Sequence, residues 1–232
     1  MITTAVRSKG KAVKESVKEY VRSRIPKGLF EAVSNVRAEW RIFLRHRAAL
    51  AKVDQFLERP EKNVNLGCGA NPKPGWINID IFDSHADLQL DLREKWPFAN
   101  ASISHIYSEH VFEHFDFHNE VPHFLSEARR VLLSEGLFDV GVPDVENALR
   151  GYGDPANPVW RVLKTIHPQW CETQLDHINY IFRQVTEHRY AWDYQTLASV
   201  LGKSGFVNIT RREFDPLLDT RPGTLFLRAT NP

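Results

Sequence analysis

This 232-residue chain has few cysteines and no long apolar run, which argues against a disulfide framework and against a membrane span. It has two cysteines, Cys68 and Cys171, which are too few for a disulfide framework and favour a reducing, cytoplasmic compartment. No run of about 18 apolar residues, the length needed to span a bilayer, is present. The first residues also lack the continuous apolar segment of a signal peptide. We therefore expect a cytoplasmic protein that is soluble or peripheral at a membrane surface.

Net charge is also small, at +1, but the two parts of the chain differ in sign. Residues 1–60 carry 14 Lys and Arg against 6 Asp and Glu, whereas residues 61–232 carry 16 against 23. An acidic body disfavours non-specific nucleic-acid binding, because that binding needs clustered cations. With 42% hydrophobic and 25% charged residues, the composition is that of a globular domain with one core.

Residues 1–60 predict a basic amphipathic helical extension. The helical pattern runs from about 5 to 58 and breaks at 26–28, where proline and glycine occur. Its apolar positions at helical spacing are Val13, Val17, Tyr20, Val21, Leu29, Val33, Val36, Trp40, Phe43 and Leu44. Such a stripe packs on the main domain or on a second subunit, or it binds an anionic membrane surface or acidic partner. Nucleic acid is the least favoured partner.

From residue 61 to 232 short apolar runs alternate with helical patterns, which indicates an α/β domain with a parallel sheet and crossover helices. The expected strands lie near 63–67, 76–81, 86–90, 103–108, 136–142, 206–213 and 223–229. Two helices are clear: 120–133, capped by Asn119, and about 194–204, capped by Asp193 and stopped by Gly205. Residues 151–187 are interrupted by glycine and proline. We expect them to form an irregular insertion on the acceptor side of a binding site.

A short buried strand at 63–66 leads directly into Gly67-Cys68-Gly69. Glycine there allows a sharp turn and lets a ligand approach the main chain, although glycine turns end many strands that bind nothing. The next strand ends at Asp80, where the ribose hydroxyls of a nucleotide meet a carboxylate in doubly wound sheets. The other interpretation is an ordinary surface Asp at a strand end.

The spacing of these two features disfavours a nicotinamide enzyme. Asp80 lies 11 positions after Gly69, whereas the dinucleotide fingerprint has its acidic residue about 20 positions further on. Pro72 and Pro74 also leave no room for a full crossover helix between the two strands.

Several further segments complete a recognisable set. They are Leu66-Gly67-Cys68-Gly69, the segment from Gly75 to Asp80, Asp91-Leu92 before Trp96-Pro97-Phe98, the segment from Ile106 to His114, Ala128 to Leu132, Val142 to Glu146, Phe182-Arg183, His188, Asp193 to Leu197 and Gly205-Phe206. Together they closely resemble a family of predicted class I S-adenosylmethionine-dependent methyltransferases. The resemblance covers about 63–229 and leaves the basic extension outside.

The resemblance implies a Rossmann-like, seven-stranded, mostly parallel sheet with S-adenosyl-L-methionine across the carboxyl ends of its first four strands. By motif position, Gly67, Cys68 and Gly69 would hold the methionine part. Asp80 would accept the ribose hydroxyls, Ile81 would pack beside the adenine, and Asp91-Leu92 would meet the adenine edge. Ser108 and Glu109, followed by His110, would line the methyl donor. Asn65 departs from the pattern, because many members of the superfamily have an acidic residue there.

A competing motif overlaps this region, because His110-Val111-Phe112-Glu113-His114 matches H-x-x-E-H, the zinc site of a class of metallopeptidases. Two histidines four residues apart on a helix share one face and can bind zinc. The segment directly follows a sheet strand, however, and only three residues have to match. We therefore expect no metal site.

The acceptor is expected to be a small molecule or a glycan or polysaccharide precursor, with His110, His188 and His177 as candidates for the catalytic base. His188 and His177 each have an acidic neighbour in the region that should cover the acceptor. Holding donor and acceptor in line is worth roughly 7–11 kcal/mol, against roughly 3–5 kcal/mol for a general base, so an unmistakable base is not required. Two alternatives stay open: an inactive scaffold with this fold, and an RNA methyltransferase.

Overall fold

A computed structural model describes residue 24 and residues 26–58 and 62–232. The chain divides between Leu44 and Arg45 into two compact units. In the first unit the structure describes mainly the beginning of helix α2, which spans Lys27–Leu50. The predicted stripe residues Val13, Val17, Tyr20 and Val21 lie outside the described residues.

Helix α2 follows the predicted helical pattern, and its apolar stripe is open to solvent. Val36 is 70% exposed and Trp40 is 61% exposed. The ring of Trp40 stacks on Phe43, with centroids 5.4 Å apart. Among the described residues, no helix has the length and apolar character to cross a membrane.

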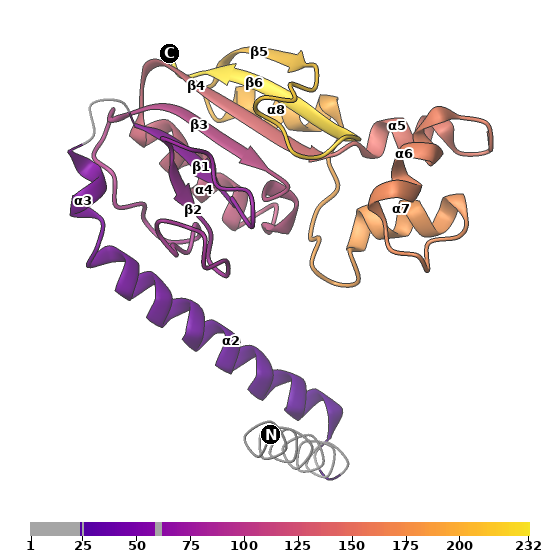
Figure 1. The fold of residues 1–232 in the computed structure, drawn as a ribbon, viewed down its shortest axis with the longest axis horizontal. Helices are drawn as coiled ribbons and strands as arrows, with labels where there is room; N and C mark the ends of the chain where they lie inside the picture. Colours follow the sequence, from indigo (N-terminus) through magenta and orange to yellow (C-terminus); the bar gives the residue numbers. More distant parts are fainter. Residues whose placement is uncertain (1–23, 25, 59–61) are drawn as a thin grey trace, which may run out of the picture. The chain divides into compact units, whose positions relative to one another are not determined.

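The second unit is built on one mixed sheet (Figure 1). Its strands are β1 (Asn63–Leu66), β2 (Ile77–Ile79), β3 (Ile103–Glu109), β4 (Leu132–Pro143), β5 (Val207–Arg212) and β6 (Thr224–Thr230). They lie in the order β2-β1-β3-β4-β6-β5. The pairs among β2, β1, β3 and β4 are parallel, and β6 is antiparallel to both of its neighbours. The carboxyl ends of β1 to β4 therefore meet at one edge of the sheet.

The α/β class is confirmed, but the expectation of seven strands is wrong, because the segment predicted as a strand at 86–90 makes only one isolated bridge, between Ile79 and Leu88. The N–H of Asn78 donates to the carboxylate of Asp87 at 2.8 Å. A side chain thus takes the donor that the next step of a ladder would use. Leu88 and Leu90 still point into the core, each 1% exposed.

The predicted helices are present as α4 (Glu120–Val131) and α8 (Tyr194–Lys203). Asp193 caps α8 as expected, by accepting a hydrogen bond from Thr196 N, and Gly205 follows it with φ +91°. The cap predicted at Asn119 is wrong: its side chain makes no cap hydrogen bond. Asp116 stands three residues earlier and its carboxylate accepts the Asn119 N–H at 2.9 Å, so the chain is turned before the helix begins.

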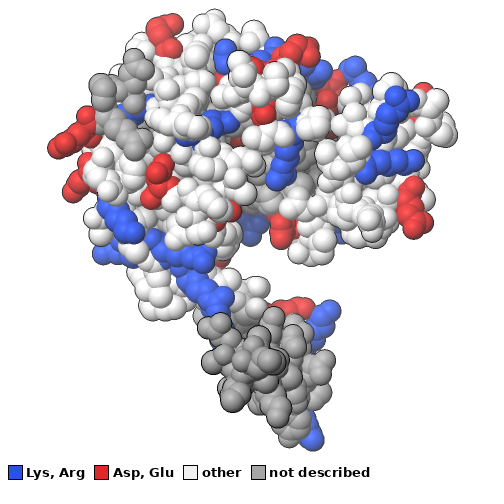
Figure 2. Space-filling view, viewed as in Figure 1, with Lys and Arg blue, Asp and Glu red and all other residues white. Residues whose placement is uncertain are grey.

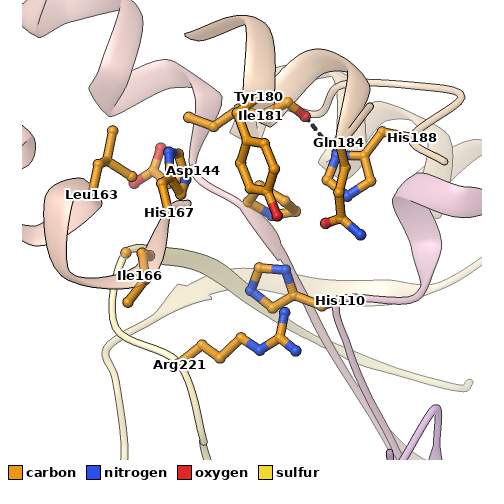
Figure 3. Close-up of a pocket in the computed structure, with 12 residues that line it drawn as sticks. His110, Asp144, Leu163, Ile166, His167, Tyr180, Ile181, Gln184, His188 and Arg221 are labelled. Carbon is orange, nitrogen blue, oxygen red and sulfur yellow. Dashed lines mark hydrogen bonds between the residues drawn. The ribbon is translucent and has the colours of Figure 1, made fainter. Parts of the chain in front are cut away.

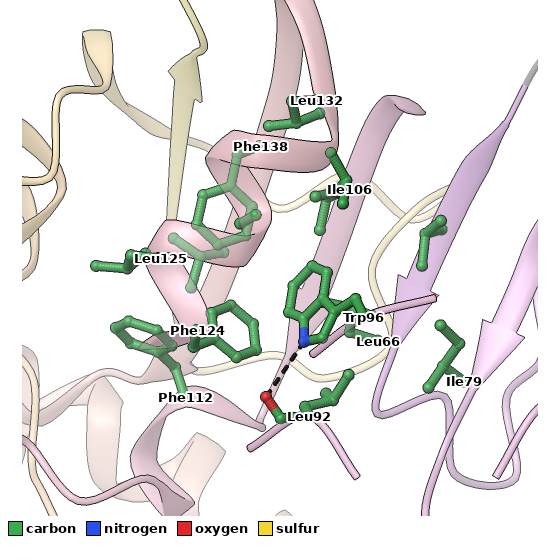
Figure 4. Close-up of a cluster of buried hydrophobic side chains, with 14 of the residues drawn as sticks. Leu66, Ile79, Leu92, Trp96, Ile106, Phe112, Phe124, Leu125, Leu132 and Phe138 are labelled. Carbon is green, nitrogen blue, oxygen red and sulfur yellow. Dashed lines mark hydrogen bonds between the residues drawn. The ribbon is translucent and has the colours of Figure 1, made fainter. Parts of the chain in front are cut away.

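Helices α4 and α8 pack on the same face of the sheet (Figure 1). Figure 4 shows Phe112 and Phe124 from this core beside Trp96, whose indole N–H donates to the carbonyl of Leu92 at 3.2 Å. Phe124 meets Trp96 edge to face, with centroids 5.1 Å apart. The short helices α3 (Asp54–Leu57) and η1 (Phe112–His114) also contribute side chains to this cluster.

The segment expected to be irregular is helical. It contains the end of α5 (Val145–Gly151), then α6 (Pro158–Ile166) and α7 (Gln174–Arg183), which form a small apolar cluster of their own around Trp160. Prolines and glycines mark helix ends here rather than breaks, since Pro158 opens α6 and Gly151 closes α5. Thr173 and Asp176 form a capping box on α7.

Candidate active site

The turn after β1 uses two glycines for different reasons. Gly67 has φ +67°, and a Cβ there would stand 2.0 Å from a methyl group of Val111. Gly69 has φ +49°, but no atom lies within 4 Å of the position of its Cβ. Gly67 therefore permits close packing against the turn after β3, whereas Gly69 borders open space.

Asp80 lies at the end of β2 with its carboxylate against the glycine turn. One oxygen accepts the Gly69 N–H at 3.1 Å. The other accepts the N–H groups of Phe82 and Asp83 at 2.7 and 2.8 Å. Main-chain donors thus fix the orientation of the carboxylate at the rim of the turn.

Asn65 and Asn78, on β1 and β2, tie the turn to the sheet. The Asn65 amide donates to Asn78 Oδ1 at 3.0 Å, and the same oxygen accepts the Lys73 N–H at 2.7 Å. The position that many superfamily members fill with an acidic residue is therefore a buried, neutral hydrogen-bonding group in this chain. The carboxylates that line the adjoining cavity are Asp80 and Glu109.

Cys68 contributes its main chain rather than its thiol. Its N–H donates to the carbonyl of Ile79 at 3.0 Å. Burial, together with the charge of Asp80, raises the pKa of the thiol to about 12. The sulfur is protonated at neutral pH, which rules out a nucleophilic thiolate at this position.

The connection between β5 and β6 closes over the end of β3. The carboxylate of Glu109 accepts hydrogen bonds from Thr220 Oγ1 at 2.6 Å and from the Arg221 N–H at 2.9 Å. The hydroxyl of Tyr107 lies 3.0 Å from Glu109 and 3.1 Å from Asp219. Glu109 therefore anchors residues 219–221 to the sheet edge.

Lys73 lies under the same connection. Its ammonium group donates to the carbonyl of Leu218 and stands 4.1 Å from the centroid of the Tyr107 ring. Burial lowers the pKa of Lys73, against the opposing effect of Glu109 and Asp219. Together, the glycine turn, Asp80, Glu109 and this lysine surround a cavity of about 280 Å³.

His110 stands directly after β3 in the left-handed region, with φ +55°. A non-glycine residue in this region is strained and persists only where its surroundings hold it. The N–H of His110 donates to Gly141 O at 2.9 Å. Its ring lies between Glu113 Oε1, 3.2 Å from Nδ1, and Thr224 Oγ1, 2.8 Å from Nε2.

A second cavity of about 440 Å³ lies on the other side of His110 (Figure 3). Helices α6 and α7 form much of its wall, with apolar side chains such as Leu163 and polar ones such as Tyr180 and Gln184. His110 and Arg221 line both cavities. The two spaces therefore meet at these two side chains.

Residues 65–140, from β1 into β4, match a family model described as a methyltransferase domain. The matched segment contains the glycine turn, Asp80 and His110. This segment, about a third of the chain, is thus similar to methyltransferase domains. S-adenosylmethionine is the cofactor of the class I methyltransferases that the sequence resembles. The first cavity fits that group, because the space beside Gly69 is one that a Cβ would fill and Asp80 offers an oriented carboxylate for ribose hydroxyls.

Solved structures resemble the methyltransferase domain only distantly. A possible exported protein from Bordetella parapertussis is 13% identical, with a TM-score of 0.45, over 81% of this chain and 67% of that one. A SAM-dependent methyltransferase from Archaeoglobus fulgidus is 12% identical, with a TM-score of 0.44, over 80% and 94%. Phosphoethanolamine N-methyltransferase 2 from Haemonchus contortus, in complex with S-adenosyl-L-methionine, is 10% identical, with a TM-score of 0.44, over 79% of this chain and 52% of that one. This chain thus spans about half of the last protein. No curated protein matches the chain.

The structure brings six of the predicted site residues of the methyltransferase domain to the first cavity. They are Gly67, Cys68, Gly69, Asp80, Glu109 and His110. Ile81, Asp91, Leu92 and Ser108 line neither of the two cavities described here. Asp91 is paired with Arg93 at 2.8 Å, and Leu92 is 8% exposed within the core. Ser108 is fully buried.

Two of the three predicted catalytic histidines line the second cavity, and the third does not reach it. His110 lines both cavities and His188 lines the second, but His177 lines neither. His177 is 1% exposed and lies behind His167, with the two Nδ1 atoms 2.9 Å apart. His167 is the one that reaches the cavity, and burial, with the neighbouring His177, lowers its pKa to about 4. It is therefore neutral at pH 7.

Several residues that line or support the first cavity were not predicted from the sequence. They are Lys73, Tyr107, Asp219, Thr220 and Arg221. The last three come from the connection between β5 and β6, which returns to the end of β3 only because β6 runs antiparallel. No motif in this connection carries that information. Glu113 was considered only as part of the H-x-x-E-H pattern.

Proposed function

We propose that the protein transfers the methyl group of S-adenosylmethionine to a hydroxyl of a small-molecule or glycan acceptor held in the second cavity. The observation that carries this proposal is the shared wall: His110 and Arg221 border both the glycine-turn cavity and the larger one. Methyl transfer requires donor and acceptor to meet in line, and this boundary is the place where two bound molecules would meet.

The cofactor, when bound, supplies a methyl group on a positively charged sulfur. The groups that would hold it are the main chain of the glycine turn and the carboxylate of Asp80. An acceptor hydroxyl that received this methyl group would lose its proton. His110 Nε2 would accept that proton, because it already faces a hydroxyl, that of Thr224, at 2.8 Å.

Glu113 positions His110 for this role. It is 1% exposed, and its Oε1 lies 3.2 Å from His110 Nδ1. A buried carboxylate at this nitrogen keeps the proton on Nδ1 and leaves Nε2 as the basic nitrogen. The strained backbone of His110 aims the ring toward the boundary between the cavities.

The second cavity suits a partly polar acceptor of modest size. Tyr180, Gln184 and Arg221 offer hydrogen-bond donors, while Leu163 and Ile166 offer apolar surface. Figure 2 shows acidic and basic side chains interspersed over the visible face of the sheet and α5 to α7 rather than a continuous basic surface. Sugars fit this wall better than a nucleic-acid backbone, which needs clustered cations.

Mass spectrometry of the purified protein tests the donor, and labelled methyl transfer tests the acceptor. We expect S-adenosylmethionine or its demethylated product to co-purify, and label to enter a small-molecule or glycan fraction of a cell extract. Cofactor binding without consumption of methyl groups against any fraction would support an inactive scaffold instead. Label that enters RNA would overturn the proposed acceptor class.

A further inference from the structure

Three side chains that could bind a metal lie together at the edge of the second cavity. They are Glu113 and His114 on η1 and His188 after α7, each with one ligand atom within 4.8 Å of the others. The Glu113 and His188 side chains are 1% and 3% exposed. His188 lines the cavity, so the cluster reaches the acceptor space through this ring.

Main-chain hydrogen bonds hold these elements together although they are far apart in sequence. Arg189 N and Tyr190 N both donate to Glu113 O, at 2.8 and 3.2 Å. The turn that delivers His188 is strained, since Val185 has φ +69°. A β-branched residue in this conformation is rare, and such strain is typical of functional sites.

The ring hydrogen bonds of the two histidines involve their Nδ1 atoms. His188 Nδ1 lies 2.6 Å from Ile181 O, and His114 Nδ1 lies 3.2 Å from Glu187 O. Each ring therefore donates Nδ1–H to a carbonyl and keeps a lone pair on Nε2. Metal-binding histidines are oriented in this way in most proteins.

Two hydrogen-bond acceptors in this cluster have no donor. Glu113 Oε2 and His188 Nε2 are both buried, and neither has a hydrogen-bond partner among the described residues. His188 Nε2 stands 3.8 Å from Glu113 Oε1, too far for a hydrogen bond. Buried acceptors that face one another are costly unless a cation lies between them.

We propose that Glu113, His114 and His188 bind a divalent transition-metal cation. Two imidazole nitrogens and one carboxylate oxygen suit Zn²⁺ and its neighbours in the first transition row better than Mg²⁺ or Ca²⁺, which prefer oxygen. Three protein ligands leave at least one coordination position open, as in catalytic zinc sites. This proposal differs from our expectation from the sequence, which was that the protein has no metal site.

The ligand set also differs from the H-x-x-E-H motif that the sequence contains. His110 does not belong to the ligand cluster, and its Nδ1 pairs with Glu113. His188, contributed from the far side of the insertion, takes its place. Glu113 can serve both partners, since Oε1 receives His110 while Oε2 is available to the cation.

The open position gives the cation a role in methyl transfer, and this part rests on the proposed function. A hydroxyl bound to a divalent cation loses its proton more readily. The cation would hold an acceptor oxygen beside His110, which takes the proton. Acceptors with two adjacent hydroxyls, as in sugars, would supply one oxygen to the cation and one to the methyl group.

A second cluster provides the control. His167, Cys171 and His177 also lie within 4.8 Å of one another. There the Nδ1 atoms of the two histidines pair with each other at 2.9 Å. His177 Nε2 is buried without a partner among the described residues, but the cluster contains no carboxylate that could face it. Cys171 lines neither described cavity, and Cys171→Ser is the matched control variant.

The test is calorimetric titration of chelator-treated full-length protein with Zn²⁺, in the absence of donor and acceptor. We expect one equivalent to bind to the wild type and to Cys171→Ser. His188→Ala and His114→Ala should weaken binding at least 10-fold. His114 is only partly buried, so that variant keeps the test valid if His188→Ala does not fold.

Absence of Zn²⁺ binding to the wild type would overturn the proposal, and so would loss of binding in Cys171→Ser with retention in folded His114→Ala. Titration of the same samples with S-adenosylmethionine separates the two ideas. Cofactor binding without Zn²⁺ binding defeats the metal site alone, whereas Zn²⁺ binding without cofactor binding defeats the proposed function.

Discussion

His110 is the residue at which the two cavities meet, and its replacement tests the proton transfer. We expect His110→Asn to lower kcat by about 10²–10⁴-fold, the usual contribution of a general base. Asparagine tolerates the left-handed backbone that His110 adopts, so the fold should survive. Cofactor affinity should change little, because the proton is taken from the acceptor.

Steady-state kinetics with a true acceptor, together with calorimetry of cofactor binding, checks this prediction. The control is His118→Ala, whose side chain is exposed and lies outside both cavities. Unchanged turnover in His110→Asn would remove His110 from the mechanism.

Replacement of each of the two turn glycines by alanine should affect stability and cofactor binding to different extents. Gly69→Ala should lower Tm by about 2–4 °C, because its positive φ costs an alanine about 1 kcal/mol. The new methyl group projects into the cofactor cavity and should weaken cofactor binding. Gly67→Ala should lower Tm much further, because its Cβ would stand 2.0 Å from the Val111 side chain.

Thermal unfolding and cofactor titration of both variants distinguish these effects. Equal losses of Tm in Gly67→Ala and Gly69→Ala would contradict the packing role of Gly67. Full cofactor affinity in Gly69→Ala would show that the open space beside it is not part of the cofactor site.

Among the elements, strand β4 carries a buried ion cluster that links four strands. Asp139 is fully buried and lies 2.8 Å from His105, 2.7 Å from Arg228 and 3.3 Å from Arg212. Burial raises its pKa, but hydrogen bonds from His105 and Arg228 outweigh this and lower the pKa to about 2. We expect Asp139→Ala to lower the free energy of unfolding by about 1–3 kcal/mol, because His105 and Arg228 lose a hydrogen-bond acceptor, whereas Arg212 keeps its pair with Asp219.

This contribution depends on pH in a defined direction. Because the folded pKa lies below the usual value, the carboxylate stabilises the fold above about pH 4, by about 2 kcal/mol. The contribution is lost as pH falls toward 2. Urea denaturation at pH 7 and pH 3 should therefore show a smaller difference between wild type and Asp139→Ala at pH 3. An equal difference at both values would contradict the assigned pKa.

Among the elements, those with a regular sequence pattern were predicted well. Places where a side chain replaces a main-chain hydrogen-bond partner were not predicted. The turn at Gly67 and the helix that Asp193 caps follow from local chemistry, and both are present. The missing strand at 86–90 depends on Asp87 reaching Asn78 across the fold. The insertion is helical although it contains proline, because Pro158 stands at the start of α6, where proline is tolerated.

In the site, too, residues within local motifs were predicted, and residues brought in by long-range contacts were not. Residues on the motif strands, such as Asp80 and Glu109, were predicted to bind the cofactor, and both line the cavity beside the glycine turn. Arg221 and Thr220 reach it only through the antiparallel return of β6. His188 and Glu113 are 75 residues apart and meet through main-chain hydrogen bonds at Arg189 and Tyr190. Contacts between residues so far apart in the chain cannot be inferred from a single sequence.

For the whole molecule, the basic extension remains the part whose partner is a prediction. Helix α2 exposes Val36 and Trp40, and residues 1–60 carry an excess of basic residues. Amphipathic basic helices bind anionic membranes, so the full chain should sediment with anionic vesicles and less with neutral ones. Trp40→Ser should reduce this binding. Equal binding to both kinds of vesicle would contradict the prediction, and concentration-dependent dimerisation would indicate a second copy as the partner.

We infer that the turn after β1 and Asp80 bind S-adenosylmethionine. Calorimetric titration of the wild type, of Asp80→Ala and of the control Asp83→Asn with this molecule measures that binding. We predict one binding site in the wild type and in the control. Asp80→Ala should bind more weakly by about 1.5–3 kcal/mol, or about 10–100-fold, because the ribose hydroxyls lose a charged acceptor. Unchanged affinity in Asp80→Ala, or no binding to the wild type, would contradict the account.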